Sequence, residues 1–210
     1  LRINGDTYHL QKGVYSDWIP ISFKAGQGKK IRGICQILLK STEPEFELYV
    51  SPIHIDPEKP VMPISQPSIY STYLSKRRGR FATLGLAEDT WALNTKALDE
   101  EEFLEQCRQF QQERQEMLLD ALAKVKKGLC VCVFDGLDRV QHMFWRYLTE
   151  EYPPNLNRPS NKYNKIIEHW YQEMDKLVGL VGRKIALEKD KHTVLMVVSD
   201  HGFNSFRYGV

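Results

Sequence analysis

Two strand-sized apolar runs, each followed at once by acidic and imidazole side chains, constrain the fold more than any other feature of the sequence. The runs are Leu129–Phe134 and Thr193–Val198, and patterns of helical period lie before and between them. A strand that is covered by helices is apolar on both of its faces, as these runs are. The order helix, strand, helix, helix, strand predicts an α/β core with a mostly parallel sheet, in which sites form where strands end.

The helical patterns have recognisable limits. We expect helices over residues 99–128, 138–148 and 163–185, the last two joined by a loop at 153–159. Asp99 and Glu102 have the spacing of a capping box, and Gly128 is the expected stop of the first helix. The helix at 163–185 carries its apolar residues on one stripe, so we expect that stripe to be buried.

The first third of the chain has the period-2 pattern of β structure. Ile19, Ile21 and Phe23 alternate with small or polar residues, a turn follows at 25–30, and the ranges 31–40 and 46–50 continue the alternation. Three antiparallel strands are the simplest outcome. Prolines between residues 52 and 67 interrupt any regular element. We therefore expect a β-rich subdomain with a proline-rich exit loop at 1–80, and part of an α/β core at 81–210.

Charge and cysteine content narrow the class of protein. The 29 Lys and Arg residues against 27 Asp and Glu leave a net charge of +2, without the basic excess of a nucleic-acid-binding protein. No apolar run approaches the roughly 20 residues that cross a bilayer. Cys130 and Cys132 alternate within an apolar run, so we expect them to be buried; with Cys35 and Cys107 they favour a reducing compartment, the cytoplasm.

The ends of the sequence indicate a piece of a larger protein. It opens at Leu1 without an initiator Met and stops nine residues after His201. We expect the 210 residues to be truncated at both ends, so a missing signal peptide says nothing about the location of the parent protein.

The residues most suited to chemistry follow the two apolar runs. Asp138 and His142 are four residues apart, which on a helix brings them to one face. Asp200 and His201 are adjacent, and a turn after a strand would let both converge on one point. Carboxylate oxygens and imidazole nitrogens are ligands of Zn²⁺ and Mn²⁺. We expect the four residues to bind metal.

Each of these residues also has an ordinary structural interpretation. Asp135 or Asp138 could cap the helix that begins there, and for Asp135 this is about as good an explanation as any functional one. His142 adjoins Met143, Phe144 and Trp145, so it could be a half-buried core histidine. The occurrence of two Asp and His pairs after two apolar runs favours the metal-binding interpretation.

These motifs resemble the alkaline phosphatase superfamily and, more closely, the type I phosphodiesterase/nucleotide pyrophosphatase family. The resemblance rests on the string from Phe134 to Tyr147 and on Asp200–Phe203. It extends back through Tyr15–Ile19 and Phe46–Ile53, which are similar to the β-rich insertion of one bacterial branch. It implies the C-terminal half of an alkaline-phosphatase-like α/β/α core with a β-rich insertion subdomain.

The resemblance also implies a mechanism. Two divalent ions about 4 Å apart, most simply Zn²⁺ with Mn²⁺ as an alternative, bind the phosphate of a small ester substrate and activate a Thr or Ser nucleophile. Asp138 and His142 would belong to one ion, and Asp200 and His201 to the other. The nucleophile, a further Asp and a further His are not identifiable here, because Thr7, Thr42 and Thr90 lie in β or loop contexts. We expect the chain alone to be inactive.

Other functions stay open at this point. A sulfatase, a phosphomonoesterase or a phosphoglycerate mutase of the same superfamily would share these ligands, and the chain could instead be a non-catalytic binding module. An apolar face left uncovered near Val131 or Leu195 would favour self-association.

Overall fold

The computed structural model describes residues 1–24, 26–28, 30–148, 162–187 and 192–204. The chain forms two compact units, Leu1–Met117 and Leu118–Val210, and the boundary between them falls inside a helix. The first unit combines small antiparallel sheets with helices, and the described elements of the second unit are helical. The expected mixed α/β class is confirmed. The predicted boundary at residue 80 separates a β-rich insertion subdomain from the α/β core. The two compact units do not test that boundary, so it stays a prediction.

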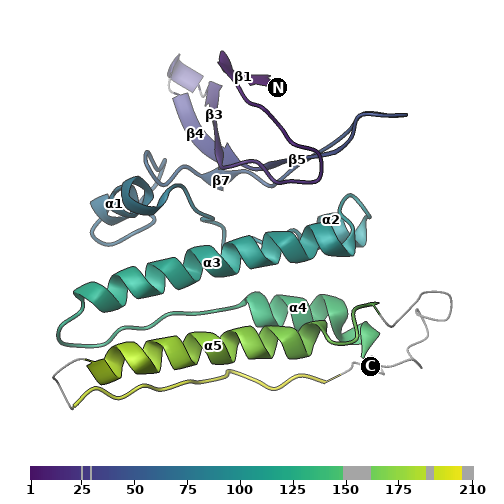
Figure 1. Cartoon of the computed structure of the whole chain (residues 1–210). Coiled ribbons are helices and arrows are strands. Elements are labelled where there is room, and N and C mark those ends of the chain that lie inside the picture. The colour runs from purple at the N-terminus through teal and green to yellow at the C-terminus, as the bar shows by residue number, and fades with distance from the viewer. Residues whose placement is uncertain (25, 29, 149–161, 188–191, 205–210) are drawn as a thin grey trace, which may run out of the picture. The chain divides into compact units, whose positions relative to one another are not determined.

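Small antiparallel sheets form the upper part of the first unit in Figure 1. The longest pairing joins β3 to β4, with Ile19 opposite Cys35 and Lys24 opposite Lys30. The alternation over Ile19–Phe23 therefore predicted strand β3 correctly, and within the expected turn the described residues Gly26–Gly28 form a 3₁₀ helix. The sheets contain β1 (Arg2–Ile3) with β2 (Asp6–Thr7), β3 (Ile19–Lys24) with β4 (Lys30–Cys35) and β7 (His54–Ile55), and β5 (Ile37–Ser41) with β6 (Glu47–Val50).

The range 31–40, expected as one strand, is divided at Gln36. Strand β4 ends before this residue and β5 begins after it, and the two strands belong to different sheets. Gln36 is buried, its backbone N–H donates to Ser51 Oγ (2.9 Å), and its side-chain Nε2 donates to Gln109 Oε1 (3.0 Å). These partners satisfy the backbone N–H and the side-chain NH₂ of Gln36 where the chain changes sheets inside the core, whereas Gln36 Oε1 has no hydrogen-bond partner among the described residues.

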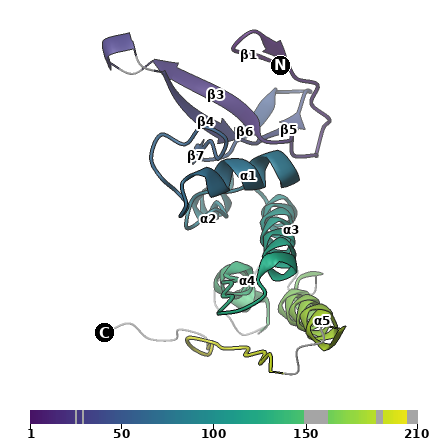
Figure 2. The same ribbon diagram turned by 90° about the vertical axis from the view of Figure 1, so that its left-hand side faces the viewer.

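The proline-rich range 52–67 contains only the two-residue strand β7 as a regular element, as its composition predicts. Helices α1 (Ile69–Arg78) and α2 (Thr90–Asn94) follow it and were not predicted. The signal for α2 is Asp89, whose Oδ1 accepts from the Ala92 N–H at 2.9 Å. Figure 2 shows α1 and the first turns of α3 on one side of the strands of the first unit.

Helix α3 (Glu100–Lys124) begins with the predicted capping box. The Glu102 N–H donates to Asp99 Oδ1, and the Asp99 N–H donates to Glu102 Oε2, both at 2.8 Å. The first half of the predicted apolar stripe is buried, as shown by Phe103, Cys107 and Phe110. The helix ends at Lys124, a turn before the expected stop at Gly128, whose φ of +107° suits a residue without Cβ.

Loss of the capping box should destabilise the first unit measurably. We expect Asp99→Ala to lower the free energy of unfolding by about 1 kcal/mol, because the Glu102 N–H loses its acceptor. Urea unfolding of the full chain measures the change, and Asp99→Ser, which restores an acceptor, is the matched control. Equal stability of the alanine variant and the wild type would contradict a capping role.

The second unit is built on α4 (Gly136–Phe144), which continues into a 3₁₀ turn at Trp145–Tyr147, and on α5 (Ile166–Leu187). These elements match the helices predicted at 138–148 and 163–185, and Trp170 and Val181 on α5 are buried as its apolar stripe predicts. Figure 2, which views the two helices nearly end-on, shows them side by side. The predicted loop at 153–159 lies outside the described residues.

The prediction that residues 129–134 and 193–198 form buried strands is wrong for the described structure. Neither run has a ladder partner among the described residues, and most of their side chains are exposed, as with Val131 (73%) and Val197 (71%). A strand needs a neighbour to take up its N–H and C=O groups, and the composition of a run does not provide one. The expected burial of the cysteines here is also wrong, because Cys132 is exposed and Cys130 is half-buried.

The exposed runs agree with the expectation of an uncovered apolar surface near Val131 and Leu195. Self-association through that surface stays a prediction. Among the residues that the structure describes, no helix has the length and apolar character required to span a membrane.

Candidate metal and phosphoester site

Helix α4 presents the first pair of candidate ligands on one face. Asp138 lies in its first turn and His142 in its last, and His142 Nε2 is 3.4 Å from Asp138 Oδ1. The spacing of four residues predicts this arrangement, which the structure shows. A negative charge near the N-terminus of a helix and an imidazole near its C-terminus also suit the helix dipole.

The second pair follows the run 193–198 and reaches the first. Asp200 Oδ1 accepts a hydrogen bond from the His201 backbone N–H at 3.0 Å, and His201 Nε2 lies 3.6 Å from Asp200 Oδ2. The same Nε2 atom is 3.8 Å from Asp138 Oδ1. The Asp138 carboxylate oxygen is therefore faced by both imidazoles, although the two motifs are far apart in the sequence.

The hydrogen bonds of His201 determine which ring nitrogen carries the proton. Its Nδ1 lies 2.8 Å from the Gly202 carbonyl oxygen, and because a carbonyl oxygen can only accept, Nδ1 is the donor. In the neutral ring the Nε2 lone pair is then available to a ligand. The bond to Gly202, followed by the charges of Asp200 and Asp138, raises the pKa of His201.

The chemistry of the donor set fits a divalent cation in part. Asp138 Oδ1 is buried and has no hydrogen-bond partner among the described residues, so it has the full acceptor capacity that a cation would use. The nearest charged donor, Arg139 Nη2, is 3.9 Å from the other carboxylate oxygen. However, no group of three or more His, Cys, Asp or Glu side chains in the described ranges is arranged to hold an ion. The donor atoms therefore suit a divalent cation, but the described residues supply only part of a ligand set for each ion.

The ordinary structural interpretations of these residues receive little support. Asp135 lies at the N-cap of α4, but its side chain makes no capping hydrogen bond. The side chain of His142 is 54% exposed, so it is not a core histidine. Asp200 is more exposed still, at 88%. The exposed side chains of His142 and Asp200 are therefore accessible to a ligand.

Two aromatic residues belong to this cluster and were given no role from the sequence. The Phe203 ring lies 4.8 Å from the His142 ring, at an interplanar angle of 83°, and 4.9 Å from the Trp145 ring. The only sequence signal was their position, since Phe203 directly follows the second motif and Trp145 follows the first. Contacts between residues so far apart in the chain cannot be read from spacing.

Comparison with known proteins gives one finding that covers this cluster. The family model for type I phosphodiesterase/nucleotide pyrophosphatase matches residues 58–209, more than two thirds of the chain, including all four candidate ligands. Comparison with curated proteins gave no match, and comparison with solved structures gave none.

Proposed function

The chain belongs to the type I phosphodiesterase/nucleotide pyrophosphatase family, and from this premise we propose that it contributes a metal-binding part of a hydrolase that cleaves phosphodiester or pyrophosphate bonds. Asp138 and His142 would hold one divalent ion, and Asp200 and His201 a second. Zn²⁺ is the first candidate because the ligands are carboxylate oxygens and imidazole nitrogens, and Mn²⁺ is the alternative.

One observation carries the proposal. The buried Asp138 Oδ1 atom lacks a hydrogen bond within the described structure and is approached by His142 Nε2 and His201 Nε2 from two separate motifs. A buried carboxylate oxygen without a partner is costly unless a ligand or a proton compensates it. A cation between the carboxylate and the imidazoles would remove that cost.

The residues of the chain would orient and hold the ligands. The bond from His201 Nδ1 to the Gly202 carbonyl keeps the Nε2 lone pair of that ring available, and the helical spacing holds His142 beside Asp138. Bound divalent ions would supply positive charge to the oxygens of a phosphoester. A small phosphate ester is thus the proposed substrate, and the family match favours it over the sulfate esters of a sulfatase.

We place the nucleophile outside these 210 residues. The resemblance implies seven ligands and reacting groups, of which four can be matched to positions in this chain. Ser199, the nearest hydroxyl in the sequence to the second motif, donates its Oγ–H to the His201 carbonyl oxygen and thus supports the turn. The chain alone should therefore bind metal weakly and hydrolyse no phosphodiester.

Metal titration tests this proposal directly. We expect Zn²⁺ to bind the wild-type chain weakly in calorimetry and in NMR titrations of the histidine ring signals, because each ion has two of the three or four ligands of a normal site. Asp138→Ala should weaken binding at least tenfold. Asp175→Ala, which removes an exposed carboxylate from α5, is the matched control and should bind as the wild type does.

Substrate class is tested with the same protein. Bis-p-nitrophenyl phosphate should bind only when Zn²⁺ is present, and binding should disappear with EDTA or in Asp138→Ala. Wild-type zinc affinity in Asp138→Ala would refute the ligand assignment. Hydrolysis of the diester above the rate with Zn²⁺ alone would refute the placement of the nucleophile outside the chain.

A further inference from the structure

Phe203 connects the two metal-binding motifs through its ring. It follows Asp200 and His201 in the chain, yet its ring packs edge-on against His142 of the other motif (4.8 Å, 83°). The Phe203 ring also contacts the ring of Trp145, which follows α4, with 4.9 Å between the ring centroids and an interplanar angle of 43°. Both distances lie in the range in which aromatic rings attract one another.

Few other groups restrain the His142 ring. Its side chain is 54% exposed, and the contacts that the described structure records for the ring are the Asp138 carboxylate and Phe203. Rotation about the bond between Cβ and an imidazole ring has broad minima, so an exposed histidine turns freely. An aromatic ring packed against one side of the imidazole removes much of this freedom.

The direction of the imidazole matters because only one ring nitrogen faces Asp138. His142 Nε2 lies 3.4 Å from Asp138 Oδ1, and a ring flip would take this atom away from the carboxylate. A ligand that is already oriented loses less conformational entropy when an ion binds. Side chains that orient metal ligands typically change metal affinity by about 10- to 100-fold when they are removed.

We propose that Phe203 is a positioning residue that holds the His142 imidazole with Nε2 toward Asp138, and that its contact with Trp145 helps to fix the Phe203 ring. The segment that carries the ligands Asp200 and His201 thus also carries the residue that orients His142 of the other motif. This inference rests on the proposed function, because the value of orienting His142 lies in metal binding.

The test compares three variants of the full 210-residue chain. Phe203→Ala removes the ring, and Phe203→Tyr keeps a ring of the same shape. Met196→Ala removes an apolar side chain that is 76% exposed in the adjoining run, so it controls for general loss of apolar surface near the motif. Zinc affinity is measured by NMR titration, which remains quantitative for weak binding.

A second measurement is made without metal. The ring current of Phe203 should displace the His142 ring proton signals, and Phe203→Ala should return them to the positions of an exposed histidine. We expect this variant to bind Zn²⁺ about tenfold more weakly than the wild type, whereas Phe203→Tyr and Met196→Ala should stay within about twofold. The ring-current shift reports on the His142 ring itself, and Met196→Ala shows the effect of a general loss of apolar surface, so the two together separate positioning from a general structural defect.

The possible results separate this inference from the function on which it rests. Loss of the ring-current shift together with a tenfold loss of zinc affinity, both restored by tyrosine, supports positioning by Phe203. Equal zinc affinity in Phe203→Ala and Met196→Ala overturns it and leaves the metal-binding proposal standing. Absence of zinc binding by the wild type overturns the proposed function, and the inference falls with it.

Discussion

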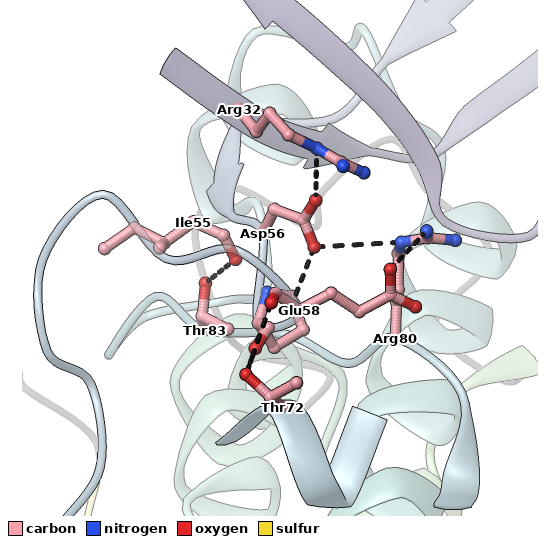
Figure 3. A network of polar contacts seen from close by, with 8 residues as sticks. Arg32, Ile55, Asp56, Glu58, Thr72, Arg80 and Thr83 are labelled. Atoms are coloured by element: carbon pink, nitrogen blue, oxygen red, sulfur yellow. Dashed lines mark hydrogen bonds and ion pairs between the residues drawn. The ribbon is translucent and has the colours of Figure 1, made fainter. Parts of the chain in front are cut away.

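Replacing Asp56 by alanine is expected to lower the free energy of unfolding of the first unit by about 3 kcal/mol. The Asp56 side chain is fully buried and lies between two arginines, with Arg32 Nε 2.9 Å from Oδ2 and Arg80 Nε 3.8 Å from Oδ1 (Figure 3). Its Oδ1 also accepts the Glu58 backbone N–H at 3.0 Å. Removal of the carboxylate would leave both guanidinium groups without their buried counter-charge.

The same network ties several segments of the first unit together. Arg80 Nη2 contacts Glu58 Oε2 at 3.1 Å, Thr72 Oγ1 of α1 donates to the Glu58 carbonyl at 3.2 Å, and Thr83 Oγ1 donates to the Ile55 carbonyl at 3.0 Å. Strand β4 and the segment after α1 thus contact Asp56 directly, and helix α1 contacts the neighbouring Glu58 (Figure 3). Loss of the carboxylate should loosen all of them together.

The size of the effect follows from burial. Removal of one partner of a buried ion pair commonly costs about 3 to 5 kcal/mol, and we take the lower value because the side chains of Arg32 and Arg80 keep 27% and 25% of their surface exposed. Glu105→Ala is the matched control, since Glu105 and Arg108 form an exposed pair whose loss should cost less than about 1 kcal/mol. Urea unfolding gives the free energy of unfolding of both variants. Equal losses in the two would show that the buried ion pairs of Asp56 contribute no more to stability than an exposed pair.

Local features of the fold were predictable from the sequence. The capping box at Asp99, the first half of the α3 stripe, the buried residues of the α5 stripe and the alternation in β3 depend on residues a few positions apart, and the structure shows each of them. The division of one expected strand at Gln36 was not predictable, because it depends on the distant partners Ser51 and Gln109. The apolar run at 129–134 shows the same limit, since β composition without a neighbouring strand does not produce a ladder.

In the candidate site, too, local features were predictable from the sequence and long-range contacts were not. The pairing of Asp138 with His142 follows from helical geometry, so the spacing alone predicts it. The approach of His201 to the same carboxylate, and the contact of Phe203 with His142, join residues that are far apart in the chain. The sequence could therefore identify the chemistry of each motif, and the way in which the motifs meet required the fold.

His54 is a buried histidine in the core of the first unit. The side chain is buried against the rings of Trp18 and Phe110, and its Nδ1 accepts the backbone N–H groups of Thr83 (2.9 Å) and Leu84 (3.3 Å). Burial lowers the pKa of His54 to about 4. A proton on Nδ1 would displace both amides, so the folded state requires the neutral ring.

Glu113, which also contacts Trp18, has the opposite shift. Burial raises the pKa of Glu113 to about 7, even though its carboxylate oxygens accept from Trp18 Nε1 (2.7 Å) and from the Ala82 N–H (2.8 Å). The folded first unit therefore holds an uncharged histidine and, below about pH 7, an uncharged glutamic acid near the same tryptophan.

We expect these two groups to impose opposite pH dependences on the stability of the first unit. Between about pH 4 and pH 6.5 the unfolded chain binds a proton at His54 that the folded chain does not, so the free energy of unfolding rises with pH. Between about pH 4.5 and pH 7 the folded chain holds a proton on Glu113 that the unfolded chain releases, so the free energy of unfolding falls as pH rises. Each contribution amounts to about 3 kcal/mol over its full range.

Single substitutions should reveal the pH dependence that each group imposes on the free energy of unfolding. In the wild type the contributions of His54 and Glu113 nearly cancel between about pH 4.5 and pH 6.5. His54→Asn keeps an acceptor for the Thr83 amide and removes the histidine titration, so its stability should fall as pH rises. Glu113→Gln removes the carboxyl titration, so its stability should rise over the same interval. Urea unfolding is monitored through the NMR signals of β3 and β4, so that the measured stability is that of the first unit. Parallel pH profiles for the two variants would contradict the shifted pKa values of His54 and Glu113. Opposite slopes would support both shifts.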